Sequence, residues 1–202
     1  AADMVIDVDG GNFDVKDDGV ALLNISATKV SGSSTSTGSF ATLELVHYGG
    51  GVGAATNTSF GQDAGTAITI GGDNVAIGKG ALTAETIGDR AVAVGTNALV
   101  SQVSDSDNED SLNVGVGHGA GYYNVTGQNN TYIGGFAGTG ASGQSNSNNT
   151  AVGKSALTAI TTGGTNTAVG SGAGDAVTTA SGSVFVGKDA GGTVTTGNDN
   201  IA

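Results

Sequence analysis

The sequence predicts an all-β fold: a parallel β-solenoid, or β-roll, of short repeats in about eight coils, preceded by a small β-strand module. Three observations support this prediction. An apolar residue followed by glycine recurs eight times, an alanine stands three residues after each of these glycines, and a continuous apolar run of three precedes several of them. Self-similarity at a fixed short period is typical of stacked repeat architectures.

Two columns of small residues define the repeat. Successive glycines are separated by 17, 17, 22, 17, 19, 17 and 17 residues. The glycines are Gly61, Gly78, Gly95, Gly117, Gly134, Gly153, Gly170 and Gly187. The alanines are Ala64, Ala81, Ala98, Ala120, Ala137, Ala156, Ala173 and Ala190. Glycine permits the positive φ of a tight corner and alanine fits a narrow interior, so both columns predict a structural role.

Each repeat is predicted to contain two strands separated by corners. The first strand, as in Val92–Val94, is a continuous apolar run, which is typical of strands buried on both faces. The second is a threonine-rich stretch such as residues 66–70, which precedes a second glycine. Asparagine stands four residues before the corner glycine in six copies, at Asn57, Asn74, Asn113, Asn130, Asn149 and Asn166. Stacking of equivalent residues predicts a hydrogen-bonded asparagine ladder.

Residues 1–56 do not follow the repeat and predict a separate β-strand module. Strand-like stretches at residues 4–8, 12–15 and 20–23 are separated by glycine- and aspartate-containing turns. A Ser/Thr/Gly spacer at residues 31–39 and a further strand at 40–48 follow. The repeat domain is expected to span residues 57–202. Its last three residues begin a ninth copy, so we expect a segment of a longer fibre-like protein.

Charge and composition exclude several classes of function. Six Lys and Arg against 18 Asp and Glu give a net charge of −12, which repels nucleic acid and anionic lipid surfaces. There is no cysteine for disulfides or thiolate metal sites, and no apolar run approaches the ~20 residues of a membrane span. The sequence predicts neither a cofactor nor membrane insertion.

Self-association is the partner prediction that the composition supports best. A coil lined by Ala, Val and Gly buries little apolar area, whereas ordering the backbone costs ~1–2 kcal/mol per residue. The second apolar face of the first strand is therefore expected to pack against further copies of the chain. We expect a homo-oligomer.

The pattern Asn-Thr-Ala-Val-Gly-x-x-Ala, at residues 149–156 and 166–173, resembles the head repeats of trimeric autotransporter adhesins and related repeats in phage fibres. The strings at residues 7–11 and 16–19, with the spacer at 31–40, look like tail-fibre and other virion proteins of marine phages. The resemblance implies a homotrimeric virion fibre that contacts other virion proteins and a host-surface glycan or protein receptor. The 17-residue repeat is longer than is usual in the adhesins, and no coiled-coil stalk is present.

The longest repeat contains an acidic insertion that is a candidate calcium site. Its oxygen-bearing side chains are Asp105, Asp107, Asn108, Glu109 and Asp110. Carboxylate and amide oxygens are the ligands that Ca²⁺ prefers. A solvated acidic loop without a metal is the alternative.

Four of the nine aromatic residues, Tyr122, Tyr123, Tyr132 and Phe136, fall between the two repeats of irregular length. Aromatic rings with polar tips suit contact with a glycan or protein receptor, and packing between chains is the alternative. His47 and His118 have no second ligand at metal-binding spacing and are expected to face solvent.

The sequence does not predict an enzyme. No Ser-His-Asp arrangement and no phosphate-binding glycine loop can be assigned. We expect a structural, host-attaching segment of a virion fibre, located in an extracellular appendage. The alternatives are a bacterial trimeric surface adhesin or extracellular filament subunit, and a glycan-cleaving tailspike, whose paired carboxylates this sequence does not place together.

Overall fold

A computed structural model describes residues 5–7, 13–17, 20–26, 29–32, 56–106 and 109–202. The chain divides into two compact units, Ala1–Leu45 and Val46–Ala202. The described residues are all β-structure and turns, and they include no helix that could cross a bilayer. The all-β prediction is confirmed.

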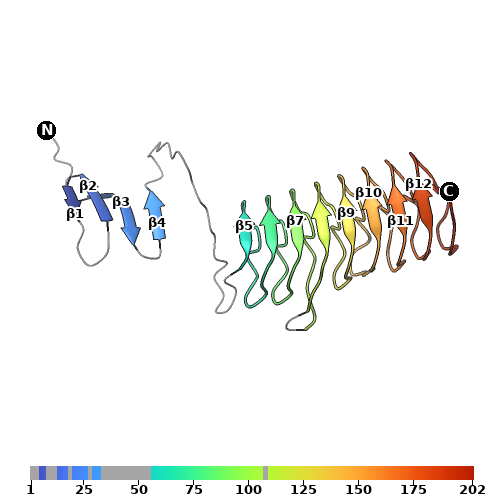
Figure 1. Cartoon of the computed structure of the whole chain (residues 1–202), viewed down its shortest axis with the longest axis horizontal. Helices are drawn as coiled ribbons and strands as arrows, with labels where there is room; N and C mark the ends of the chain where they lie inside the picture. Colours follow the sequence, from blue (N-terminus) through green and yellow to red (C-terminus); the bar gives the residue numbers. More distant parts are fainter. Residues whose placement is uncertain (1–4, 8–12, 18–19, 27–28, 33–55, 107–108) are drawn as a thin grey trace. The chain divides into compact units, whose positions relative to one another are not determined.

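The first unit contains a four-stranded antiparallel sheet in the order β1-β2-β3-β4 (Figure 1). Its strands are β1 (Val5–Asp7), β2 (Phe13–Asp17), β3 (Val20–Ser26) and β4 (Lys29–Gly32). The register between β2 and β3 shifts between Val15 and Lys16, where a β-bulge adds one residue. The first three strands lie where the sequence predicts them. The start of the expected spacer belongs instead to β4, and the strand expected at 40–48 lies outside the described residues.

The second unit is a parallel β-solenoid, as the repeat predicts (Figure 1). Eight strands pair in sequence order, each with the equivalent residues of the next repeat. The strands are β5 (Thr58–Phe60), β6 (Val75–Ile77), β7 (Val92–Val94), β8 (Val114–Val116), β9 (Thr131–Ile133), β10 (Thr150–Val152), β11 (Thr167–Val169) and β12 (Val184–Val186). The five extra residues of the longest repeat and the two of the 19-residue repeat leave this register unchanged, because both insertions lie in turns.

Each coil contains one strand, so the prediction of two strands per coil is wrong. Residues 66–70 form turns and bends rather than a strand. The backbone of this side is still bonded between coils, as from Thr69 N to Thr86 O at 2.8 Å and from Thr161 N to Thr178 O at 2.9 Å. The one or two backbone bonds per coil at these positions connect neighbouring coils but do not form a continuous ladder, so they make no second sheet.

The glycine column marks the corner that follows each strand. The eight glycines have φ between 124° and 136°, a region that L-residues with a side chain rarely adopt. A Cβ on any of the first seven would lie at most 2.7 Å from the backbone of the glycine in the next coil. Conformation and close contact therefore both require glycine here.

The alanine column closes a tight turn after each corner. The amide of each alanine donates to the carbonyl of the corner glycine three residues earlier, at 3.2–3.3 Å. Alanines 81 to 173 of this column are fully buried, and Ala64 is nearly so. A small side chain suits this buried position beside the turn.

The asparagine ladder is confirmed. The Oδ1 atom of each asparagine accepts a backbone N–H from the equivalent residue of the next coil, as from Asn74 to Asn57 at 2.8 Å and from Asn166 to Asn149 at 3.0 Å. The Nδ2 atom donates to a carbonyl across its own coil, as from Asn57 to Gly71 at 2.7 Å. All six side chains are buried. Each amide thus satisfies buried backbone groups that the turns leave without partners.

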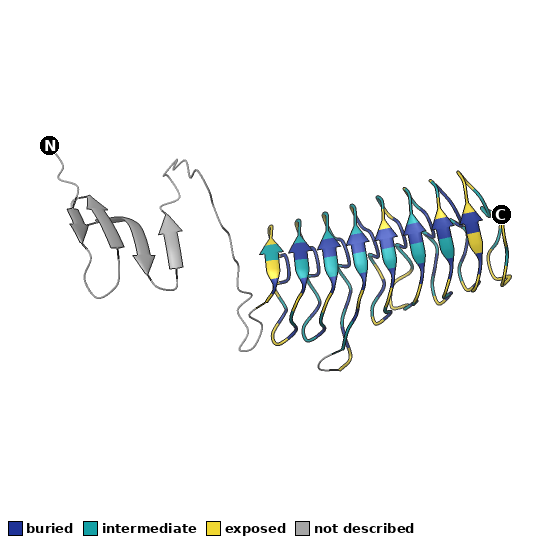
Figure 2. Cartoon of the chain, in the orientation of Figure 1, coloured by how far each residue is buried: buried dark blue, intermediate teal, exposed yellow. Residues whose placement is uncertain are grey.

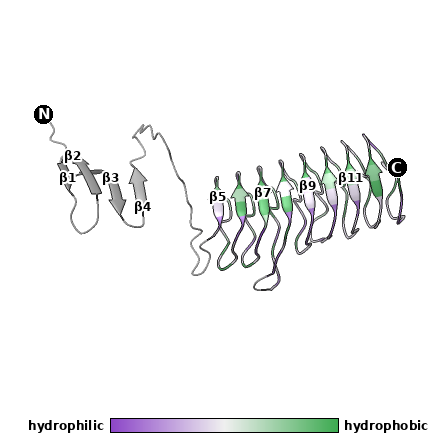
Figure 3. Cartoon of the chain, viewed as in Figure 1, coloured by the Kyte–Doolittle hydropathy of each residue, from purple (hydrophilic) through white to green (hydrophobic). Residues whose placement is uncertain are grey.

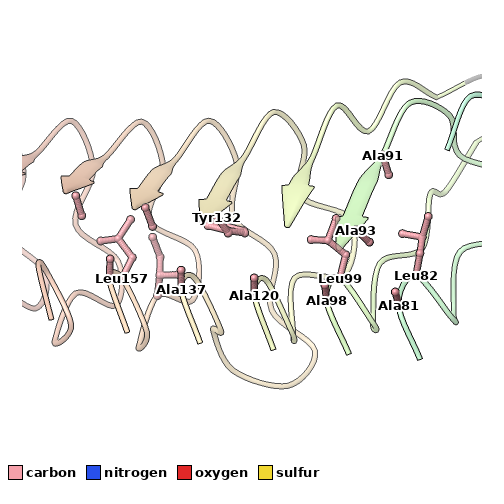
Figure 4. Close-up of a cluster of buried hydrophobic side chains, with 14 of the residues drawn as sticks. Ala81, Leu82, Ala91, Ala93, Ala98, Leu99, Ala120, Tyr132, Ala137 and Leu157 are labelled. Atoms are coloured by element: carbon pink, nitrogen blue, oxygen red, sulfur yellow. The ribbon is translucent and has the colours of Figure 1, made fainter. Parts of the chain in front are cut away.

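The interior is filled by pairing large with small residues. The strand centre faces the residue after the column alanine, which is always Gly or Leu. Alanine at the strand centre accompanies leucine in three coils, as in the pair Ala151 and Leu157, whereas an aromatic residue accompanies glycine, as in the pair Phe185 and Gly191. Figure 4 shows Tyr132 and the leucines inside the coils. In these coils a large residue at one position is matched by a small residue at the other, which fills the interior without overpacking. Gly115 and Gly121 are both small, and the side chain of Leu99 from the preceding coil fills the space beside them.

Only the inner face of the solenoid sheet is buried within the chain (Figure 2). The central residue of each strand from β6 to β12 is buried, and its two neighbours point outward and are half-buried or exposed. The expectation of strands buried on both faces therefore does not hold for a single chain. Figure 3 shows that β6, β7 and β12 are hydrophobic along their length. The outer face of the sheet therefore carries an apolar residue at the third position of every strand, and either valine or threonine at the first.

Candidate functional site

The described residues of the acidic insertion form hydrogen bonds with the neighbouring coils. Glu109 accepts the backbone N–H of Asp105 at 3.0 Å and also the side chain of Gln128. Asp110 pairs with the guanidinium of Arg90, which raises the pKa of Arg90. These bonds connect the insertion to the coils before and after it.

The predicted calcium site is not assembled by the described residues. Asp107 and Asn108 lie outside them, while Glu109 and Asp110 are engaged with Gln128 and Arg90. Within residues 56–106 and 109–202, no group of three or more Asp, Glu, His or Cys side chains could hold a metal ion. Calcium binding at this insertion stays a prediction.

Tyr132 does not belong to a receptor-facing surface. It occupies the centre of β9, is fully buried, and donates its hydroxyl hydrogen to Asn146 Oδ1. Burial raises the pKa of Tyr132 well above its usual range. The ring crosses the interior of the only repeat with a 19-residue interval, and a receptor cannot reach it. The sequence prediction is therefore wrong for this residue and its role is packing.

The other three aromatic residues lie on neighbouring coils and, with His118, form an exposed cluster that we call the aromatic patch: His118, Tyr122, Tyr123 and Phe136. The rings of His118 and Phe136 meet edge to face with centroids 4.8 Å apart. Those of Tyr122 and Tyr123 are 4.6 Å apart. Gly119 brings the pairs together, since a Cβ there would lie 3.0 Å from Phe136 and 3.8 Å from Tyr122. His118 faces solvent as the sequence predicts, whereas His47 lies outside the described residues.

Phe136 occupies a strained backbone position. Its φ is 60°, in the left-handed region, and 42% of the residue is exposed. The equivalent positions of the other coils are also left-handed, and they hold Asp63, Gly80, Asn97, Gly119, Ser155, Gly172 and Asp189. Gly, Asn and Asp tolerate this conformation, whereas a bulky residue loses roughly 1 kcal/mol in it. An exposed phenylalanine regains little of that cost by burial, which is typical of a residue retained for binding.

Buried polar side chains line the interior of the middle coils, which the sequence analysis did not predict. Glu85 is fully buried, and its Oε1 accepts the backbone N–H groups of Thr86, Ile87, Gly88 and Ser104 at 2.8–3.2 Å. Its Oε2 accepts the hydroxyl of Ser104 at 3.2 Å. The carboxylate thus closes the second corner of its coil. Equivalent positions in the other coils hold the buried residues Ile68, Gln102, Asn124, Ile160 and Val177, so a comparison of columns indicates an interior position.

Replacing Glu85 with Gln is expected to lower the free energy of unfolding by about 1–2 kcal/mol, because neutral hydrogen bonds replace charge-assisted ones while the shape is kept. The measurement is urea unfolding at pH 7. Asp63→Asn is the control, because it removes the same charge at an exposed left-handed position that already holds Asn97 in another coil. Equal effects of the two substitutions would show that the carboxylate is not needed to close the corner.

The asparagine ladder is interrupted at Ala91, between Asn74 and Asn113, and Gln102 supplies a substitute acceptor there. Ala91 stands where an asparagine is expected and cannot supply an Oδ1 acceptor. Gln102, fully buried in the same coil, instead accepts Asn113 Nδ2 at 2.7 Å. In the regular coils the preceding asparagine plays this part, as between Asn166 Nδ2 and Asn149 Oδ1 at 3.1 Å. Gln102 thus replaces the acceptor for the side-chain amide of Asn113.

The described residues form no catalytic constellation. They do form two surfaces to which a partner could bind. One is the aromatic patch and the other is the outer face of the solenoid sheet. Comparison of the chain with models of protein families, with curated proteins and with solved structures finds no match.

Proposed function

We propose that this chain is a structural segment of an extracellular fibre, most simply a virion tail fibre or similar appendage, that self-associates through its solenoid and contributes to attachment to a host surface. The observation that carries the proposal is the continuous, uncharged outer face of the eight-stranded sheet. The virion assignment itself is supported by the sequence resemblance.

The outer face has the properties of an interface between copies of the chain. None of the residues in strands β5 to β12 is charged, although the chain has a net charge of −12. The third position of every strand is apolar, and Phe60 and Val186 are about 60% exposed. Seven steps of ~4.8 Å make this strip ~34 Å long. Such a long exposed apolar strip is typical of an interaction surface.

A second copy of the chain suits this strip better than an unrelated globular partner. Any partner must match the strand spacing at every coil, and an identical solenoid has the same rise. Because carboxylates are absent from the strip, two copies can approach there without placing like charges in contact. Three copies around one axis would cover the strip of each, which is the homotrimer that the resemblance implies.

Replacing Val94 with Lys is expected to abolish self-association while leaving the fold intact. Val94 is the outward-facing third residue of β7, so a lysine there reaches solvent in the single chain but would be buried unpaired between copies. Light scattering coupled to size-exclusion chromatography measures the mass of the particle. Thr96→Lys, at an exposed position just beyond the corner glycine, adds the same charge and is expected to leave the assembly unchanged.

A wild-type chain that elutes as a monomer at every concentration would contradict the proposal. Equal loss of assembly in the Val94 and Thr96 variants would show that net charge, rather than the outer face, controls association.

The second candidate is a bacterial surface adhesin or extracellular filament subunit, which would use the same solenoid and the same outer face. It is favoured by the resemblance of the asparagine-containing repeat to adhesin heads. Electron microscopy of purified phage particles and of bacterial envelopes, labelled with an antibody against the chain, distinguishes the two locations.

A further inference from the structure

We propose that the aromatic patch binds a neutral saccharide. This proposal rests on the proposed attachment function and names the class of ligand. The patch interrupts the regular repeat. At the position of Phe136 and at that of His118, the other coils present only small or hydrophilic residues, among them Ser155 and Lys154. Four ring-bearing side chains come together on two neighbouring coils, between the acidic insertion and the 19-residue repeat.

The backbone at the patch supports binding rather than folding as the reason for Phe136. The residue is held at a φ of 60° while 42% of its surface stays exposed. Its ring lies over Gly119 as the side chains of Asn97 and Asp189 lie over Gly80 and Gly172. The coil therefore forms equally well with a small polar residue at this place. Phenylalanine adds an edge-to-face contact with His118 and an aromatic surface that stays 42% exposed.

The arrangement of the rings matches the chemistry of a sugar. One face of a pyranose ring presents C–H groups and its rim presents hydroxyls. The patch offers the faces of Phe136 and Tyr123, both exposed, with polar atoms at the imidazole of His118 and the phenol groups. An apolar platform with a few polar groups at its edge is the usual composition of a small-ligand site.

The charge of the chain selects neutral over acidic saccharides. A net charge of −12 repels polyanions from the chain as a whole. The patch is also small compared with the ~800 Å² that each partner contributes to a stable protein–protein interface. A neutral oligosaccharide is therefore the partner whose size and charge the patch accommodates.

The test uses the whole chain and saturation-transfer NMR with maltohexaose, cellohexaose and chitohexaose, and with hexagalacturonate as the acidic probe. We expect at least one neutral hexasaccharide to bind and hexagalacturonate not to bind. Phe136→Ser, which copies Ser155, is expected to weaken binding by about ten-fold or more while its melting temperature stays the same or rises. The control Asp63→Ser, at the equivalent position of the first coil, is expected to bind as the wild type does.

Four results would overturn the inference. Three concern binding: no binding of any neutral hexasaccharide at millimolar concentration, binding of hexagalacturonate alone, or unchanged binding by Phe136→Ser. The fourth is a lower melting temperature of that variant, which would show that Phe136 serves folding. The mass of the particle is measured on the same samples. A chain that assembles but binds no neutral saccharide refutes this inference and leaves the proposed fibre segment standing.

Discussion

Gly134→Ala is expected to lower the free energy of unfolding of the solenoid by about 4 kcal/mol or more, the largest effect of any single substitution considered. The φ of Gly134 is 132°, which alone costs a residue with a side chain on the order of 1–3 kcal/mol. The added Cβ would also lie 2.5 Å from the carbonyl oxygen and 2.6 Å from the carbonyl carbon of Gly153. That backbone cannot retreat, because it is bonded into the next coil.

Gly135→Ala is the matched control for this prediction. Gly135 is the next residue along the chain, has no positive φ, and a Cβ there would meet nothing within 4 Å. We expect its urea midpoint to stay within about 0.5 kcal/mol of the wild type. If both variants unfold at the same urea concentration, the corner geometry does not explain the glycine column.

Tyr132→Ala is expected to cost about 3–5 kcal/mol of unfolding free energy, because it empties the centre of a coil and leaves a cavity. Gly138→Leu alone is also expected to destabilise. A Cβ on Gly138 would lie 2.7 Å from Cγ of Tyr132 and closer still to two further ring atoms. Together the two substitutions copy the pair Ala151 and Leu157 of the next coil. The double variant is therefore expected to recover at least half of the loss caused by Tyr132→Ala.

The backbone permits this exchange. Gly138 has a φ of 56°, and the leucines at the equivalent position, Leu82, Leu99 and Leu157, have φ of 48–51°. Urea unfolding of the four proteins gives the coupling energy of the pair, which we expect to be several kcal/mol in favour of the double variant. Additive losses would show that the interior is not filled by exchanging volume between these two positions. Tyr132→Phe, which keeps the ring and loses only the bond to Asn146, is the control.

The solenoid could be predicted from the sequence because stacking imposes the same requirement on every copy. A residue that contacts its own equivalent in the next coil is repeated eight times, and the glycine, alanine and asparagine columns are visible for this reason. The ladder of Asn74 and Asn57 follows from the same logic. The number of strands per coil could not be predicted from the sequence. Threonine-rich stretches have a high strand propensity even where they form too few backbone bonds with the next coil to make a strand.

The site residues could be predicted only in part, because they are the exceptions to the repeat. Tyr132 and Phe136 are four residues apart and both depart from their columns, yet one points into the coil and the other to solvent. The strand centre of Tyr132 and the left-handed turn of Phe136 decide this difference. Neither hydrophobicity nor spacing distinguishes them. His118 joins the patch only because the next coil places it 4.8 Å from Phe136.

The buried polar groups illustrate the same limit. Glu85 and Gln102 have the composition of surface residues, and such side chains are rarely fully buried. Glu85 is tolerated inside because the turn around it presents four backbone N–H groups, and Gln102 because Ala91 leaves a vacant acceptor position in the ladder. Part of each condition is distant along the chain, since Ser104 is 19 positions from Glu85 and Asn113 is 11 positions from Gln102.

The sequence by itself therefore determined the all-β class, the parallel stacking, the register of the coils and the identity of the small residues that corners and interior require. It could do so because those interactions join equivalent positions and repeat along the chain. Only the tertiary structure decided which aromatic residues are exposed, which polar groups are buried and which face of each strand remains available to a partner. These properties depend on contacts between non-equivalent positions, whose distances no periodicity in the sequence records.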